Sequence, residues 1–123
     1  MRPFELLVVS AVIELGAGVA LLARPSSSVK RLLGARLETA ADRTLGRLAG
    51  AALLALGVAC ALACLDAQGP AARAVIGGML TYNVGALVVL GVAGVRKRPV
   101  GRALWPAVAL HAVMTIWCGA SLV

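Results

Sequence analysis

Residues 4–23 read FELLVVSAVIELGAGVALLA, an apolar run that carries the acidic residue Glu14 near its centre. About 20 apolar residues, each with a rise of about 1.5 Å, cover the roughly 30 Å hydrocarbon core of a bilayer. The run therefore predicts a transmembrane helix. A carboxylate in the middle of a membrane is costly, so Glu14 needs a proton, a partner or a function.

The composition of the whole chain indicates the same class of protein. Hydrophobic residues make up 61% of the 123 residues and charged residues only 14%, and the mean hydropathy is +0.96. These values are typical of an integral membrane protein and exclude a small soluble domain. The net charge of +7 is expected to meet lipid phosphates and to set the topology, so no nucleic-acid partner is predicted.

Three further apolar runs complete a set of four predicted spans, at residues 4–23, 44–65, 72–95 and 103–122. Charged segments that contain proline separate them. The spans are rich in small residues, which let helix backbones approach closely in lipid. We expect a single all-α membrane domain over residues 1–123, built as an antiparallel bundle of four transmembrane helices.

Only the first connection between spans, residues 24–43, is long. Within it, Ser28 is a candidate cap for a short basic amphipathic helix at residues 29–37, which would lie on the membrane surface. An irregular basic loop is the alternative.

Most of the twelve basic residues fall in the first and third connections, whereas the opposite side carries only Arg2 and Arg73. The positive-inside rule then places both basic connections in the cytoplasm and both termini outside. The residues counted on the basic side are Arg24, Lys30, Arg31, Arg36, Arg43, Arg96, Lys97, Arg98 and Arg102.

Polar side chains recur at one depth in the predicted spans. Counted from the outer helix ends, Glu14 lies at about 15 Å and His111 at about 16 Å. Tyr82 and Asn83 lie at about 14 Å. Arg47 begins the second span about 10 Å from this level, and its long side chain can reach inward or snorkel outward. We predict that these residues form a polar cluster at the membrane midplane.

Two interpretations of this cluster stay open. In the first, Glu14 exchanges a proton for a solute, because a carboxyl group inside a membrane stays charged only beside a cation such as Arg47 or His111. The protein would then be a proton-linked transporter or a small-molecule binder. In the second, a protonated Glu14 bonds to Asn83 or His111 and specifies helix packing in a non-catalytic accessory or assembly subunit of a larger membrane complex.

No motif for a nucleotide, a haem or covalent catalysis occurs in the sequence, so neither a cofactor nor an enzyme activity is predicted. Cys60, Cys64 and Cys118 and the single histidine lack the spacing of a metal site. We expect no metal and assign the thiols to packing, since free cysteine is a common small apolar residue.

The plan of four spans with a glutamate centred in the first resembles the small multidrug resistance transporters. In that family the glutamate binds either protons or a cationic substrate within a dimer, and the resemblance assigns this role to Glu14. The family has short loops and a pocket lined by aromatic residues. This chain differs in its long connection at residues 24–43 and in its aromatic content of 3%.

A second resemblance covers most of the chain, to uncharacterised small bacterial four-span membrane proteins. The matching pieces are residues 13–14, 46–50, 79–83 and 104–107, together with His111. This resemblance implies the inner membrane of a bacterium. The partners that we expect are the lipid bilayer and, according to the function, either a small-molecule ligand within a homodimer or the subunits of a larger membrane complex.

Overall fold

The computed structural model describes residues 2–96 and 99–123, so Lys97 and Arg98 of the third connection lie outside the described residues. The elements are α1 (Pro3–Ala23), α2 (Pro25–Leu33), α3 (Ala40–Ala63), the 3₁₀ helix η1 (Cys64–Asp66), α4 (Pro70–Arg96) and α5 (Leu104–Leu122). Of these, α1, α3 with η1, α4 and α5 are long and apolar enough to cross a membrane. The expected all-α architecture of four membrane-spanning helices is confirmed.

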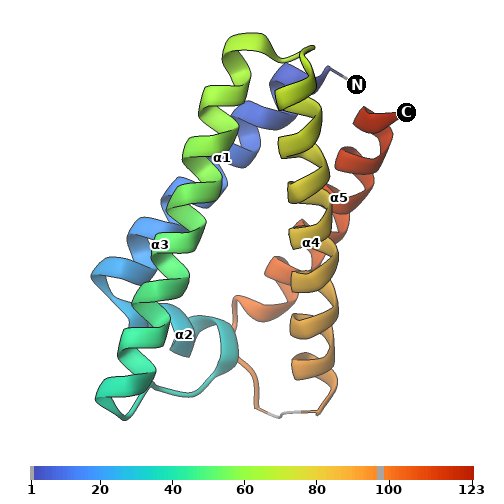
Figure 1. Cartoon of the computed structure of the whole chain (residues 1–123). Coiled ribbons are helices and arrows are strands. Elements are labelled where there is room, and N and C mark those ends of the chain that lie inside the picture. The colour runs from blue at the N-terminus through green and yellow to red at the C-terminus, as the bar shows by residue number, and fades with distance from the viewer. Residues whose placement is uncertain (1, 97–98) are drawn as a thin grey trace.

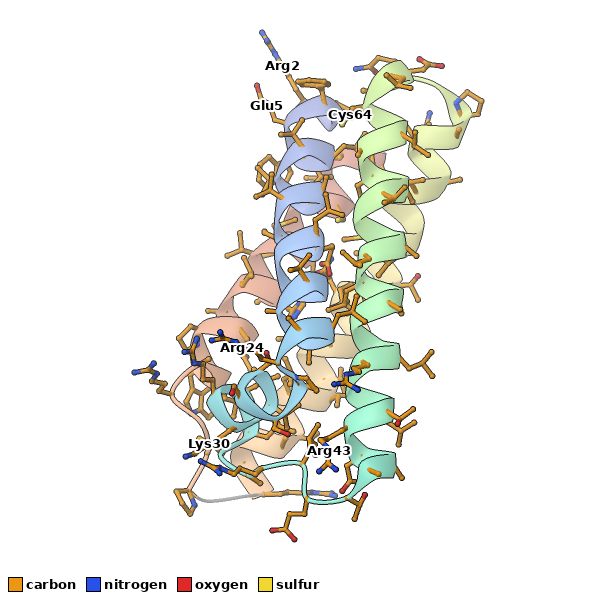
Figure 2. All side chains as sticks on the ribbon, turned by 90° about the vertical axis from the view of Figure 1, so that its left-hand side faces the viewer. Arg2, Glu5, Arg24, Lys30, Arg43 and Cys64 are labelled. Atoms are coloured by element: carbon orange, nitrogen blue, oxygen red, sulfur yellow. The ribbon has the colours of Figure 1, made fainter. Side chains whose placement is uncertain are left out.

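The four long helices form two antiparallel pairs (Figure 1). α1 packs mainly against α3, and α4 packs mainly against α5, whereas the two pairs touch each other less extensively. Both termini lie at one end of the bundle, here called the terminal end. α2 lies at the other end, here called the basic end, where Figure 2 shows Arg24, Lys30 and Arg43.

Three buried glycines bring α1 and α3 together. A Cβ added at Gly18 would lie 2.8 Å from the carbonyl oxygen of Gly50, and one at Gly50 would lie 2.9 Å from the backbone nitrogen of Leu22. A Cβ at Gly57 would lie 2.9 Å from the backbone nitrogen of Leu15. Because backbone atoms cannot yield as a flexible side chain can, this close approach requires glycine.

The apolar core lies in the half of the bundle near the terminal end. Its buried side chains come from all four long helices: Leu6, Leu7, Ala11, Cys60, Ala63, Ala72, Ile76, Met79, Met114 and Cys118. Toward the basic end, burial is mainly at contacts within a pair, such as Gly50 against α1 and Gly94 against α5. Large apolar side chains such as Val12 and Ile116 are exposed, which suits contact with lipid.

The short helix in the first connection exists, but the expected limits, residues 29–37, are wrong. α2 begins at Pro25 and ends before Gly34. Proline is favoured at the first position of a helix because its φ is already helical, and Gly34 adopts the left-handed conformation (φ 78°) that ends one. Ser28 does not cap the helix, since its hydroxyl donates to the carbonyl oxygen of Ala20 at 3.1 Å.

α3 begins at Ala40, earlier than the expected start at residue 44, because Thr39 and Asp42 form a capping box. The Asp42 N–H donates to Thr39 Oγ1 and the Thr39 N–H donates to Asp42 Oδ2, each at 3.0 Å. These two bonds satisfy backbone donors that a helix start leaves free. Hydropathy alone detects the apolar part of this helix and misses its polar first turn.

Candidate functional site

A polar cluster lies near the middle of the long helices, where the two helix pairs meet. α1 contributes Glu14, α4 contributes Tyr82 and Asn83, and α5 contributes His111. Glu14 is 3% exposed and Asn83 is 1% exposed, while Tyr82 and His111 are half-buried. Counted along the helices from the terminal end, all four residues lie about 16 to 20 Å deep. The structure therefore brings four of the five predicted residues to one level.

Asn83 and His111 bond to each other across the α4–α5 pair. His111 Nδ1 and Asn83 Oδ1 lie 2.8 Å apart, so the ring donates from Nδ1 to the amide oxygen. Asn83 Nδ2 donates to the Met79 carbonyl oxygen, also at 2.8 Å. The Tyr82 and His111 rings meet edge to face with centroids 5.6 Å apart. The side chains of Asn83 and His111 thus satisfy each other at this level, whereas Trp117 Nε1 and Ser121 Oγ of α5 are buried without a partner among the described residues.

The Glu14 carboxyl group has no comparable partner. Among the residues that the structure describes, it makes no hydrogen bond and no ion pair. The bond to Asn83 or His111 that a packing role predicts is not formed within these residues, and Asn83 and His111 bond instead to each other. A buried polar group without a partner is unfavourable, and in native proteins such a group calls for a functional explanation.

Two residues outside the predicted set, Ser10 and Cys60, border Glu14. Ser10 is 1% exposed and lies one turn before Glu14 on the same face of α1, and its buried Oγ has no hydrogen-bond partner in the described part of the chain. Cys60 on α3 is fully buried and lies one turn from Gly57, which packs against Leu15, the residue next to Glu14. Helical spacing alone predicts that Ser10 shares the face of Glu14, whereas identifying Cys60 requires knowing that α1 pairs with α3.

Arg47, the fifth predicted residue, lies outside the cluster. Gly57 packs against Leu15, next to Glu14, and Arg47 lies about 15 Å from Gly57 along α3. Its side chain is exposed, so of the two orientations considered it takes the outward one. Arg47 therefore does not neutralise Glu14.

Similar sequence surrounds the buried polar residues of α1 and α4, the first helices of the two pairs. Residues 14–17 read ELGA, and residues 83–86 read NVGA. One turn before each, Ser10 and Met79 are also buried. Glu14 and Asn83 are thus both buried near the middle of their helices, and each is followed two residues later by Gly-Ala.

Other candidate ligands lie apart from this cluster. No group of three or more His, Cys, Asp or Glu side chains suited to a metal ion occurs in residues 2–96 and 99–123. A small pocket at the terminal end includes Arg73 and Ser121, and Arg73 Nη2 donates to the Leu122 carbonyl oxygen at 3.2 Å. A larger pocket opens at the basic end, beside α2.

Comparisons of the chain with protein-family models, with curated proteins and with solved structures found no match. The fold and the cluster define a class of protein by themselves. It is a multi-pass membrane protein of four spans with a buried acidic side chain that is unpaired among the residues the structure describes.

Proposed function

We propose that the protein is a proton-linked transporter or binder of a small cationic molecule, in which Glu14 exchanges a proton for the solute. The observation that carries this proposal is the buried Glu14 side chain, which makes no hydrogen bond and no ion pair among the described residues. In a medium of low polarity a carboxyl group is either neutral or beside a cation. A proton and a cationic solute are therefore alternative occupants of the same group.

The position of Glu14 between the two pairs supports a site that can open. Glu14 belongs to the α1–α3 pair, while Asn83 and His111 line the opposite side of the boundary. Many transporters hold their solute near the bilayer midplane between structural repeats, which rock against each other. The limited contact between the pairs and the similar sequence around Glu14 and Asn83 fit this arrangement.

For its location we propose the inner membrane of a bacterium, with α2 at the cytoplasmic surface and both termini outside. The concentration of arginine and lysine at the basic end supports this orientation. Reporter fusions to the C-terminus test it, and a cytoplasmic C-terminus would contradict it.

The function is tested by the pH dependence of tetraphenylphosphonium uptake into proteoliposomes. Glu14→Gln keeps the size and hydrogen-bonding groups of a protonated acid, so the fold should persist while uptake loses its pH dependence. Glu5→Gln is the matched control, since Glu5 is exposed in the first turn of the same helix. It should leave the wild-type curve unchanged, and coincident curves for wild type and Glu14→Gln would reject the proposal.

The second candidate is a non-catalytic accessory or assembly subunit of a larger membrane complex. It is favoured by the glycines on the outer surface of α4, since a Cβ added at Gly78 or Gly85 would meet no atom within 4 Å. Such a surface allows a further helix to approach closely. Purification from native membranes discriminates the two: a stable homodimer favours transport, and one defined larger complex favours the accessory role.

A further inference from the structure

We infer that the pocket at the basic end binds the phosphate headgroup of an anionic phospholipid from the surrounding leaflet. The pocket has a volume of about 490 Å³ and is lined by Ser27, Lys30, Arg31, Arg36 and Arg102. Its lining thus consists of cationic side chains and one hydroxyl group, with no acidic side chain among the lining residues described. This inference does not depend on Glu14 or on the transport proposal.

The geometry of α2 directs its charges toward the pocket. Ser27, Lys30 and Arg31 share one face of the helix by their spacing, and all three are exposed. Val29 and Leu33 lie on the opposite face and are partly buried. A short helix with one apolar and one basic face is suited to the plane of the membrane interface.

Backbone contacts hold the two walls of the pocket together. Arg102 comes from the connection between α4 and α5, and the N–H of the next residue, Ala103, donates to the Arg31 carbonyl oxygen at 2.9 Å. Gly101 is buried so close to the same carbonyl group that a Cβ there would collide with it. Gly34, with its positive φ, turns the chain away from α2 at this point.

This arrangement gathers cations that repel one another. The backbone bond fixes their positions, so side-chain movement alone cannot fully separate the charges. A bound anion would offset the repulsion, and the arginine guanidinium group matches the oxygen pairs of a phosphate. At the end of membrane-spanning helices, the phosphates at the right depth are those of the lipid headgroups.

Native mass spectrometry of the full chain, released from nanodiscs of phosphatidylglycerol and phosphatidylcholine, tests the inference. Wild type should retain phosphatidylglycerol in preference to phosphatidylcholine. Arg31→Gln/Arg102→Gln should reduce that preference by about tenfold, because charge-assisted hydrogen bonds are lost. Arg24→Gln/Arg43→Gln is the control, since it removes the same charge from exposed residues at the same end that do not line the pocket.

Equal losses in the two double variants would overturn the inference, because they would indicate attraction to the overall charge of that end. Wild-type retention in Arg31→Gln/Arg102→Gln would overturn it as well. Gly101→Ala gives a second test that keeps every charge. The added Cβ should push α2 away from the connection between α4 and α5 and so weaken lipid retention. Unchanged retention would show that binding does not depend on this contact.

A competition experiment with inorganic phosphate shows whether the pocket binds a lipid headgroup or a soluble phosphate. Added in excess to wild-type nanodiscs, it should leave the bound phosphatidylglycerol in place, because a lipid is also held by its acyl chains in the bilayer. Displacement of the lipid by inorganic phosphate would overturn the lipid assignment and identify a site for a soluble phosphate.

Discussion

The two helix pairs are held together by different means. α1 and α3 meet backbone to backbone at Gly18, Gly50 and Gly57, whereas α4 and α5 are joined at the midplane by the bond between Asn83 and His111. At the level of Glu14, the first pair leaves the Ser10 hydroxyl group and the Glu14 side chain without a partner among the described residues, whereas the second pair joins Asn83 to His111. Nearer the terminal end, the second pair also leaves Trp117 Nε1 and Ser121 Oγ without a partner among these residues. The comparison shows that close packing of helices does not by itself give every buried polar group a hydrogen-bond partner.

The largest expected effect comes from adding a methyl group to the backbone contact of the first pair. Gly50→Ala should lower the free energy of unfolding by about 3 kcal/mol, because the new Cβ meets backbone atoms of Gly18 and Leu22 that cannot move aside. Reversible unfolding with sodium dodecyl sulfate in mixed micelles measures the change. A neutral result would show that α1 and α3 are farther apart than the structure places them.

The next largest effect is expected in the second pair. Asn83→Ala should lower the free energy of unfolding by about 2 kcal/mol, because it removes the amide oxygen that accepts the hydrogen bond from His111 Nδ1. Thr81→Ala is the control on the same helix, since its exposed hydroxyl bonds only to the Gly77 carbonyl oxygen. The double variant Asn83→Ala/His111→Ala should lower the free energy of unfolding by less than the sum of the two single changes. Strictly additive losses would show that Asn83 and His111 do not interact.

A smaller effect of opposite sign is expected at Ser10. Ser10→Ala removes a buried hydroxyl group without a partner, so the free energy of unfolding should rise by about 1 kcal/mol. Ser28→Ala, which deletes a hydroxyl group that does donate a bond, should lower it. If the Ser10 hydroxyl group binds the solute, Ser10→Ala should take up less tetraphenylphosphonium although its fold is more stable. Destabilisation by Ser10→Ala would show that the Ser10 hydroxyl group has a hydrogen-bond partner in the membrane.

The smallest effect is expected at the open glycines of the second pair. Gly85→Ala should raise the free energy of unfolding by about 0.5 kcal/mol, because alanine is the better helix former and its Cβ meets no atom within 4 Å. The same micelle titration used for Gly50→Ala measures it, which makes the two alanines a direct comparison. A loss as large as that of Gly50→Ala would show that α4 packs on another chain, and would favour the accessory role.

Much of the architecture could be predicted because hydropathy reports directly on membrane helices. The four spans were placed close to their observed limits, since lipid forces every backbone polar group into helix bonds. The errors lie where proline or local hydrogen bonds determine the first residue of a helix, at the start of α2 and at the capping box before α3. Those signals are specific residues in polar segments, which an average over apolar residues does not register.

The candidate site was only partly predictable, for a related reason. Depth along a helix follows from residue number, so Glu14, Tyr82, Asn83 and His111 were expected at one level and lie there. Rotation about the helix axis does not follow from residue number when several faces are apolar. Arg47 therefore proved to be exposed, although it could have reached inward.

The sequence by itself determined that this chain forms helices able to cross a membrane, that an acidic residue lies midway along the first, and that the positive charge gathers at one end. Only the tertiary structure decided which helices pair, because the choice depends on glycine backbones that fit against each other in space. That pairing sets Asn83 against His111 and leaves Glu14 between the pairs. Partner choice for a buried polar group is a property of the packed helices, since bonds form between whichever groups the close contacts bring within reach.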